Sequence, residues 1–134
     1  MKKSIKHLFL FAGLLAFNLS QAEEDGIPER PNPPRLVNNL SKEFAGFISP
    51  QEENLLEKKL TQFAEETSNQ IAIVIVDDLS GYEIPDFAFR LGEKWGIGQE
   101  KLDNGILIII KPTGGAGNRD EGIAVGRGLE GAIP

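Results

Sequence analysis

The distribution of apolar and polar positions predicts two buried strands. Residues 106–110 form an unbroken run of isoleucine and leucine, and residues 70–76 form a second run that is almost entirely apolar. Continuous runs rich in β-branched residues are typical of strands covered on both faces of a sheet. The run over residues 106–110 follows Asp103-Asn104-Gly105. This segment is a turn signal, because Asp and Asn accept local hydrogen bonds and glycine tolerates positive φ.

A 3.6-residue period predicts an amphipathic helix that begins near Ser49 and ends at residues 67–69. Leu56, Leu60 and Phe63 fall on one helical face. Ser49-Pro50-Gln51-Glu52 supplies a hydroxyl N-cap, a proline at the first helical position and a glutamate three residues after the cap. This arrangement is a capping box.

A second amphipathic helix is predicted from Ile84 to Trp95, with Pro85 in its first turn and Gly96-Ile97-Gly98 after its last turn. Residues 121–126 read as a short third strand after a glycine-rich loop. Two short apolar patches are expected to pack on the domain without regular structure: residues 36–39 and residues 44–48.

These elements predict an α/β fold. A strand, a crossover helix and a second strand form a βαβ unit, whose strands are parallel and whose crossover is right-handed. The third strand is expected to return antiparallel to the second. The predicted architecture is a central mixed β-sheet with amphipathic helices on both faces, an α/β/α sandwich.

Residues 1–22 have the pattern of a secretory signal peptide. Three lysines precede an apolar stretch over residues 8–19, and Ser20-Gln21-Ala22 offers small residues for cleavage. The stretch is shorter than the roughly 20 residues that cross a bilayer, although an uncleaved anchor is the alternative. We therefore expect export to the periplasm or the cell exterior.

Residues 23–36 are acidic and then proline-rich, a composition that favours extended conformations. We interpret them as a linker before a domain at residues 37–134. A peptide-binding role for the prolines is the alternative.

Charge and composition exclude several function classes. Removal of residues 1–22 takes away three lysines and no acid, so the formal net charge changes from −6 to −9. A chain this acidic is a poor partner for nucleic acid or anionic lipid. The chain has no cysteine, and its single histidine, His7, lies in the signal segment. The mature domain therefore lacks Ser-His-Asp and Cys-His machinery and Cys/His zinc ligands.

The predicted topology brings Asp103 and Glu130 to the same edge of the sheet. The second buried strand begins at this edge, and the antiparallel third strand ends there. Two carboxylates, the Asn104 amide and nearby carbonyl oxygens are suitable ligands for a hard divalent cation such as Ca²⁺. The alternative is that Asp103-Asn104-Gly105 is only a turn and that Glu130 caps a following helix.

Asp77 and Asp78 are weaker candidates. They follow the first buried strand and are expected at the opposite edge of the sheet. Paired carboxylates with unequal pKa values are used in acid/base catalysis, but a loop is the commoner explanation of such a pair.

A glycine pattern over residues 126–131 fits G-x-G-x-x-G. Its context does not fit a dinucleotide site, because the preceding strand is the last one and no acid follows about 20 residues later. We expect no dinucleotide cofactor.

Five segments in order resemble the TPM domain, which occurs in exported bacterial proteins and in a thylakoid-lumen protein of photosystem II repair. They are Phe44-Ala45-Gly46-Phe47-Ile48-Ser49, Gly81-Tyr82-Glu83-Ile84-Pro85-Asp86-Phe87-Ala88, Lys94-Trp95-Gly96-Ile97-Gly98, Asp103-Asn104-Gly105-Ile106-Leu107 and Val125-Gly126-Arg127-Gly128-Leu129-Glu130-Gly131.

The resemblance implies an α/β sandwich, a divalent-cation site and, for the plant member, acid phosphatase activity. The matching positions for the cation are Asp103, Asn104 and Glu130, with Asp77 and Asp78 as weaker candidates. Family members usually continue beyond the position of Pro134 with an acidic residue and a further helix. The resemblance therefore implies that part of the site and the core lies beyond this point.

Three function classes follow. The first, which we favour, is a Ca²⁺-binding interaction module of the cell envelope that acts on a protein partner. The second is a metal-dependent phosphomonoesterase, in which Asp103 and Glu130 hold the cation and Arg127 either clamps the phosphate or pairs with a surface acid. The third is a structural accessory domain.

Overall fold

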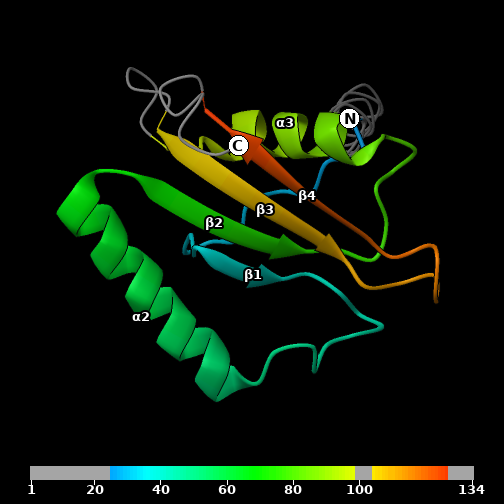
Figure 1. Ribbon diagram of the computed structural model, residues 1–134, viewed down its shortest axis with the longest axis horizontal. Coiled ribbons are helices and arrows are strands. Elements are labelled where there is room, and N and C mark those ends of the chain that lie inside the picture. Colours follow the sequence, from blue (N-terminus) through cyan, green and yellow to red (C-terminus); the bar gives the residue numbers. More distant parts are fainter. Residues whose placement is uncertain (1–24, 99–103, 127–134) are drawn as a thin grey trace, which may run out of the picture.

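The computed structural model describes residues 25–98 and 104–126, which form a four-stranded sheet and two α-helices (Figure 1). The elements in chain order are β1 (Val37–Asn39), α2 (Pro50–Thr67), β2 (Gln70–Ile75), α3 (Ile84–Trp95), β3 (Gly105–Lys111) and β4 (Asp120–Val125).

The strand order is β1-β2-β3-β4. β1, β2 and β3 are parallel, with Ile73 opposite Ile108, and β4 is antiparallel to β3, with Ile108 opposite Ile123. The sequence-based predictions of a parallel βαβ unit, an antiparallel third strand and an α/β fold with a mixed sheet are therefore confirmed.

β1 is the element that the sequence pattern missed. Residues 36–39 were expected to lack regular structure, but Val37–Asn39 pair with β2. One further hydrogen bond extends this pairing at each end. The Ile73 amide donates to the Leu36 carbonyl at 2.7 Å, and the Leu40 amide donates to the Ile75 carbonyl at 2.8 Å. A strand of three residues is too short to show a period-2 pattern.

α2 begins and ends as its local sequence predicts. Ser49 and Glu52 form the complete capping box, and Ser68 ends the helix in the left-handed region at φ 63°. α2 lies beside β1 in Figure 1. The Glu57 carboxylate of α2 accepts hydrogen bonds from the Leu36 and Val37 amides, which fixes the helix to the start of β1.

α3 supplies most of the helical part of the core. It lies behind β3 and β4 in Figure 1, and Gly96 ends it at φ 63°. A Cβ at Gly122 of β4 would lie 3.0 Å from Cγ1 of Ile84, so the helix approaches β4 closely where that strand has no side chain. The buried α3 residues are Ile84, Phe87, Ala88, Leu91 and Trp95.

Burial alternates along β3. Leu107 and Ile109 are buried in the core, whereas Ile106, Ile108 and Ile110 are half-buried, and the neighbouring Ile123 is 58% exposed. The unbroken apolar run predicted coverage of both faces. Within the described ranges, one face is fully covered and the other only partly.

The structure differs from the expected linker over residues 25–36. Ile27 is only 3% exposed and belongs to the same hydrophobic core as α3 and β2, as does Leu36. We call residues 25–36 the N-terminal strap. Its apolar and main-chain groups pack against the domain.

Candidate functional site

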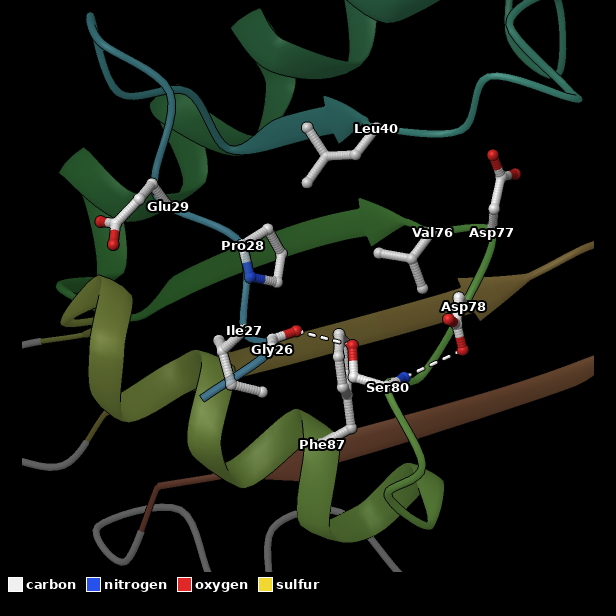
Figure 2. Close-up of a pocket in the computed structure, with 10 residues that line it drawn as sticks. All are labelled: Gly26, Ile27, Pro28, Glu29, Leu40, Val76, Asp77, Asp78, Ser80 and Phe87. Carbon is white, nitrogen blue, oxygen red and sulfur yellow. Dashed lines mark hydrogen bonds between the residues drawn. The ribbon is translucent and has the colours of Figure 1, made fainter. Parts of the chain in front are cut away.

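A hollow of about 320 Å³ lies at the C-terminal ends of β1 and β2 (Figure 2). The C-terminal ends of parallel strands are where open α/β sheets place their ligands. The lining residues are Gly26, Ile27, Pro28, Glu29, Leu40, Val76, Asp77, Asp78, Ser80 and Phe87.

The N-terminal strap forms one wall of this hollow. The Ser80 hydroxyl donates to the Gly26 carbonyl at 2.7 Å, and the Tyr82 hydroxyl donates to the Asp25 carbonyl at 2.9 Å. A side chain at position 26 would be excluded, because a Cβ there would lie 2.8 Å from the Cβ of Ser80 and φ is +68°. The wall therefore depends on glycine at this position.

Lys94 and Trp95 of α3 hold the strap in place. The Lys94 ammonium donates to the Asp25 carboxylate at 3.1 Å and to the Ile27 carbonyl at 2.9 Å, and it pairs with Glu29 at 3.1 Å. Burial lowers the pKa of Lys94, but its hydrogen bonds with Glu29 and Asp25 outweigh this effect and raise the pKa above its ordinary value. The Trp95 indole N–H donates to the Pro28 carbonyl at 2.8 Å.

Asp77 is tied to the loop that follows β1. Its carboxylate accepts from the Ser41 hydroxyl at 2.5 Å, from the Lys42 amide at 2.8 Å and from the Glu43 amide at 3.3 Å. The Ser41 hydrogen bond is the main cause that lowers the pKa of Asp77, and the Lys42 amide adds to it. The charge of Asp77 therefore organises residues 41–43 against the end of β2.

Asp78 is exposed, and its Oδ1 accepts from the Ser80 amide at 2.9 Å. Figure 2 shows Asp77 and Asp78 at the same end of the hollow, with Glu29 on the opposite side and its side chain pointing away. The two aspartates predicted from sequence thus lie together at a ligand-sized hollow. Asp77 has a structural role there, and Asp78 presents its carboxylate to solvent.

Asn104 lies at the opposite end of the strands from this hollow, where β3 begins. It is 5% exposed, and its side-chain amide donates to the Ser68 carbonyl. Its own carbonyl accepts from the Gln70 amide at 3.1 Å. Asn104 therefore joins the start of β3 to the turn between α2 and β2.

β4 ends at the same edge, because the Gly126 amide donates to the Gly105 carbonyl at 2.8 Å. This confirms the predicted topology, in which the strand ends near Asn104 are at the opposite edge from Asp77 and Asp78. Asp103, Arg127 and Glu130 lie outside the described residues, as does all of the glycine pattern after Gly126.

Within residues 25–98 and 104–126, no group of three or more His, Cys, Asp or Glu side chains is arranged to hold a metal ion. Asp77 and Asp78 form a pair and not such a group. None of the helices described in those ranges is both long enough and apolar enough to span a bilayer.

Sequence reasoning missed the Ser41 partner of Asp77 and the wall that the N-terminal strap forms. Ser41 carried no signal, because a single serine in a loop has no pattern that points to an acid 36 residues away. The strap carried a weak signal in Ile27, an isolated apolar residue between acids and prolines. Such a residue needs an apolar contact, and a free linker provides none.

Comparison with protein families matches residues 41–134 to the TPM domain. Among solved structures, the solution NMR structure of the N-terminal domain of a protein from P. gingivalis is similar, with 28% identity and a TM-score of 0.57. The match covers 72% of this chain and 57% of that chain. The curated proteins include no significant match. The family match spans more than half of the sequence, and the chain belongs to the TPM domain family.

Proposed function

We propose that this TPM-domain chain is an exported cell-envelope module that binds a divalent cation, most suitably Ca²⁺, and acts by contact with a protein partner. The observation that carries the proposal is the hydrogen bond from Gly126 to Gly105. It brings to one edge the two strand ends whose continuations in the chain carry Asp103 and Glu130.

The donor set supports a hard cation. Asp103, Asn104 and Glu130 offer only oxygen ligands of the kind that Ca²⁺ prefers, and the mature chain has neither cysteine nor histidine. The formal charge of −9 after removal of residues 1–22 also favours cations.

Asp77 and Asp78 are a second candidate cation site and fit less well. Both oxygens of Asp77 already accept hydrogen bonds from residues 41–43. A metal ion bound to Asp77 would compete with the hydrogen-bond donors that hold residues 41–43 in place. The adjoining hollow adds mostly apolar side chains, and its other two oxygen-bearing side chains already have partners, Ser80 with the Gly26 carbonyl and Glu29 with Lys94.

A Ca²⁺ titration followed by amide chemical shifts tests the cation proposal. We expect saturable shifts at Gly105 and Gly126 that are lost in Asp103→Asn and in Glu130→Gln. Asp78→Asn is the matched control and should keep them. The proposal fails if no saturable shift occurs at Gly105 and Gly126, or if only Asp78→Asn removes it.

Export is supported by the charge and apolar pattern of residues 1–22. Expression with this segment should give a secreted or periplasmic protein whose mass corresponds to a start near Glu23. A protein that keeps its full mass and remains with the membrane would support the uncleaved anchor instead.

Phosphomonoester hydrolysis is the second candidate, because the matched family is named for a phosphatase. With no histidine or cysteine in the mature chain, such a reaction would use an activated water or a carboxylate nucleophile. Arg127, which follows β4 in the chain, is the basic residue that would hold the phosphate in this case. Phosphate release from a generic monoester should vanish in Asp103→Ala and persist in Asp77→Ala. Equal turnover in both variants and the unmodified protein would exclude this site.

A further inference from the structure

The hollow at the ends of β1 and β2 has apolar walls and an acidic end. Leu40, Val76 and Pro28 belong to its walls, and Asp77 and Asp78 lie together at one end (Figure 2). Its volume of about 320 Å³ exceeds that of any single side chain, so a side chain from another molecule can enter it.

The charge of the lining has one sign. The ten lining residues include three carboxylates and no basic residue. Glu29 is compensated by Lys94, 3.1 Å away. Asp77 and Asp78 form no ion pair among the described residues. The excess negative charge therefore lies at the Asp77–Asp78 end.

We propose that this hollow binds a basic side chain, lysine or arginine, of a protein partner. The alkyl stem lies between Leu40, Val76 and Pro28, and the charged head lies at Asp78. The inference deepens the proposed interaction function and rests on it, because it names the chemistry of the partner's contact.

Long basic side chains match both parts of the hollow. Lysine and arginine bury their methylene stems on apolar surface and keep the charged head in polar surroundings. Asp78 has a carboxylate at the solvent boundary, and its Oδ1 accepts only from the Ser80 amide among the described residues. Asp77 adds negative charge without having to release its loop, because an ammonium or guanidinium needs no complete coordination shell.

Other occupants fit less well. An anion would meet the carboxylates of Asp77 and Asp78 at the acidic end of the hollow. A hydrated metal ion would meet mostly apolar walls, in which the Ser80 hydroxyl already bonds to Gly26 and Glu29 already pairs with Lys94. An uncharged apolar group would contact the apolar walls but would leave the carboxylates of the acidic end without a partner.

The proposal is tested with small probes and amide chemical shifts. The lysine probe is N-acetyl-lysine N-methylamide. One control probe, the norleucine analogue, keeps the stem without the charge, and the other, the 2,3-diaminopropionic acid analogue, keeps the charge on a short stem. We expect saturable shifts at Leu40, Val76 and Ser80 with the lysine probe, and at least twofold weaker binding of both controls. Absence of saturable shifts, or equal binding of the norleucine analogue, overturns the proposal.

Two variants test whether the charged head of the bound side chain contacts Asp78. Asp78→Asn keeps the acceptor for the Ser80 amide and removes the charge, so lysine binding should weaken about two- to fivefold, as for one exposed ion pair. Asp86→Asn removes an exposed acid of α3 that pairs with Arg90 and lies outside the lining, so binding should be unchanged. Equal weakening in both variants would mean nonspecific attraction and would overturn the proposal.

The same samples separate this inference from the cation proposal. Lysine binding that is lost in Asp78→Asn, together with Ca²⁺ shifts at Gly126 that persist, supports both. Lysine binding without any Ca²⁺ response at Gly105 and Gly126 supports the proposal for the hollow and contradicts the cation proposal. A Ca²⁺ response without lysine binding contradicts only the proposal for the hollow.

Discussion

The carboxylate of Glu57 binds the main chain of β1, with its Oε2 2.7 Å from the Val37 amide nitrogen. The same side chain accepts from the Leu36 amide at 2.9 Å. One residue of α2 therefore satisfies two amides at the start of β1, a strand whose only partner within residues 25–98 and 104–126 is β2.

Replacement of Glu57 by alanine should destabilise the protein by about 2 kcal/mol, because two amides lose a charged acceptor. Urea unfolding provides the measurement. Glu53→Ala is the control: Glu53 pairs with Arg35 at 3.7 Å across the surface, so its loss should cost less than about 1 kcal/mol. Equal costs for the two variants would show that the amide contacts are not important for stability.

The N-terminal strap can be followed through the single tryptophan of the chain. Ile27→Asp places a charge at a position that is 3% exposed, and burying an unpaired charge is costly. The strap should therefore detach from α3, and Trp95 emission should shift to longer wavelength with easier acrylamide quenching. Leu55→Asp is the matched control at a position that is 67% exposed, and it should leave emission unchanged. Unchanged emission in Ile27→Asp would mean that residues 25–36 do not cover Trp95 in solution.

Asp77 should make stability depend on acid pH. The pKa of Asp77 in the folded protein lies below its ordinary value of 3.8, chiefly because Ser41 donates to it. The unfolded chain therefore binds the proton more readily. The contribution is complete above the unfolded pKa and is lost as pH falls through the folded value.

The difference in unfolding free energy between the unmodified protein and Asp77→Asn checks this dependence. The difference should be constant near neutral pH and should shrink as pH falls below 3.8, the ordinary value for this group. A difference that stays constant throughout the acid range would contradict the assigned role of Asp77.

Gly105 should tolerate no side chain. A Cβ at this position would lie 2.4 Å from the carbonyl oxygen of Ile97, which is main chain and cannot rotate away. Gly105→Ala should cost about 3 kcal/mol, at the upper end for overpacking. Gly46→Ala is the control, since nothing lies within 4 Å of its Cβ position, and its effect should stay within about 0.5 kcal/mol. Similar thermal midpoints for the two variants would refute the close approach.

Local patterns predicted the elements whose signals are contained within a few residues. The capping box at Ser49 and Glu52 and the glycine stop at Gly96 gave both helices with the observed ends. The strands β2 and β3 were long enough to show their apolar runs. β1 was not, because its three residues become a strand only through pairing with β2.

The candidate site was predicted only in part. The predicted topology placed Asp77 and Asp78 at the end of the sheet opposite the start of β3. The parallel pairing of β2 and β3 confirms this position. The strap wall of the hollow was not predicted, because a proline-rich composition does not show where Ile27 finds an apolar contact. The role of Asn104 as a buried tie to Ser68 was also hidden within a turn signal.

The sequence by itself determined the helices, the two central strands, the acidic charge and the absence of histidine and cysteine from residues 23–134. These features depend on residue type and short-range period. Only the tertiary structure decided what each acid does. Asp77 holds a loop because Ser41, 36 residues away, reaches it, while Asp78, its neighbour in the chain, faces solvent at the hollow. Adjacent residues differ in role because long-range contacts, and not local sequence, determine which donors each carboxylate meets.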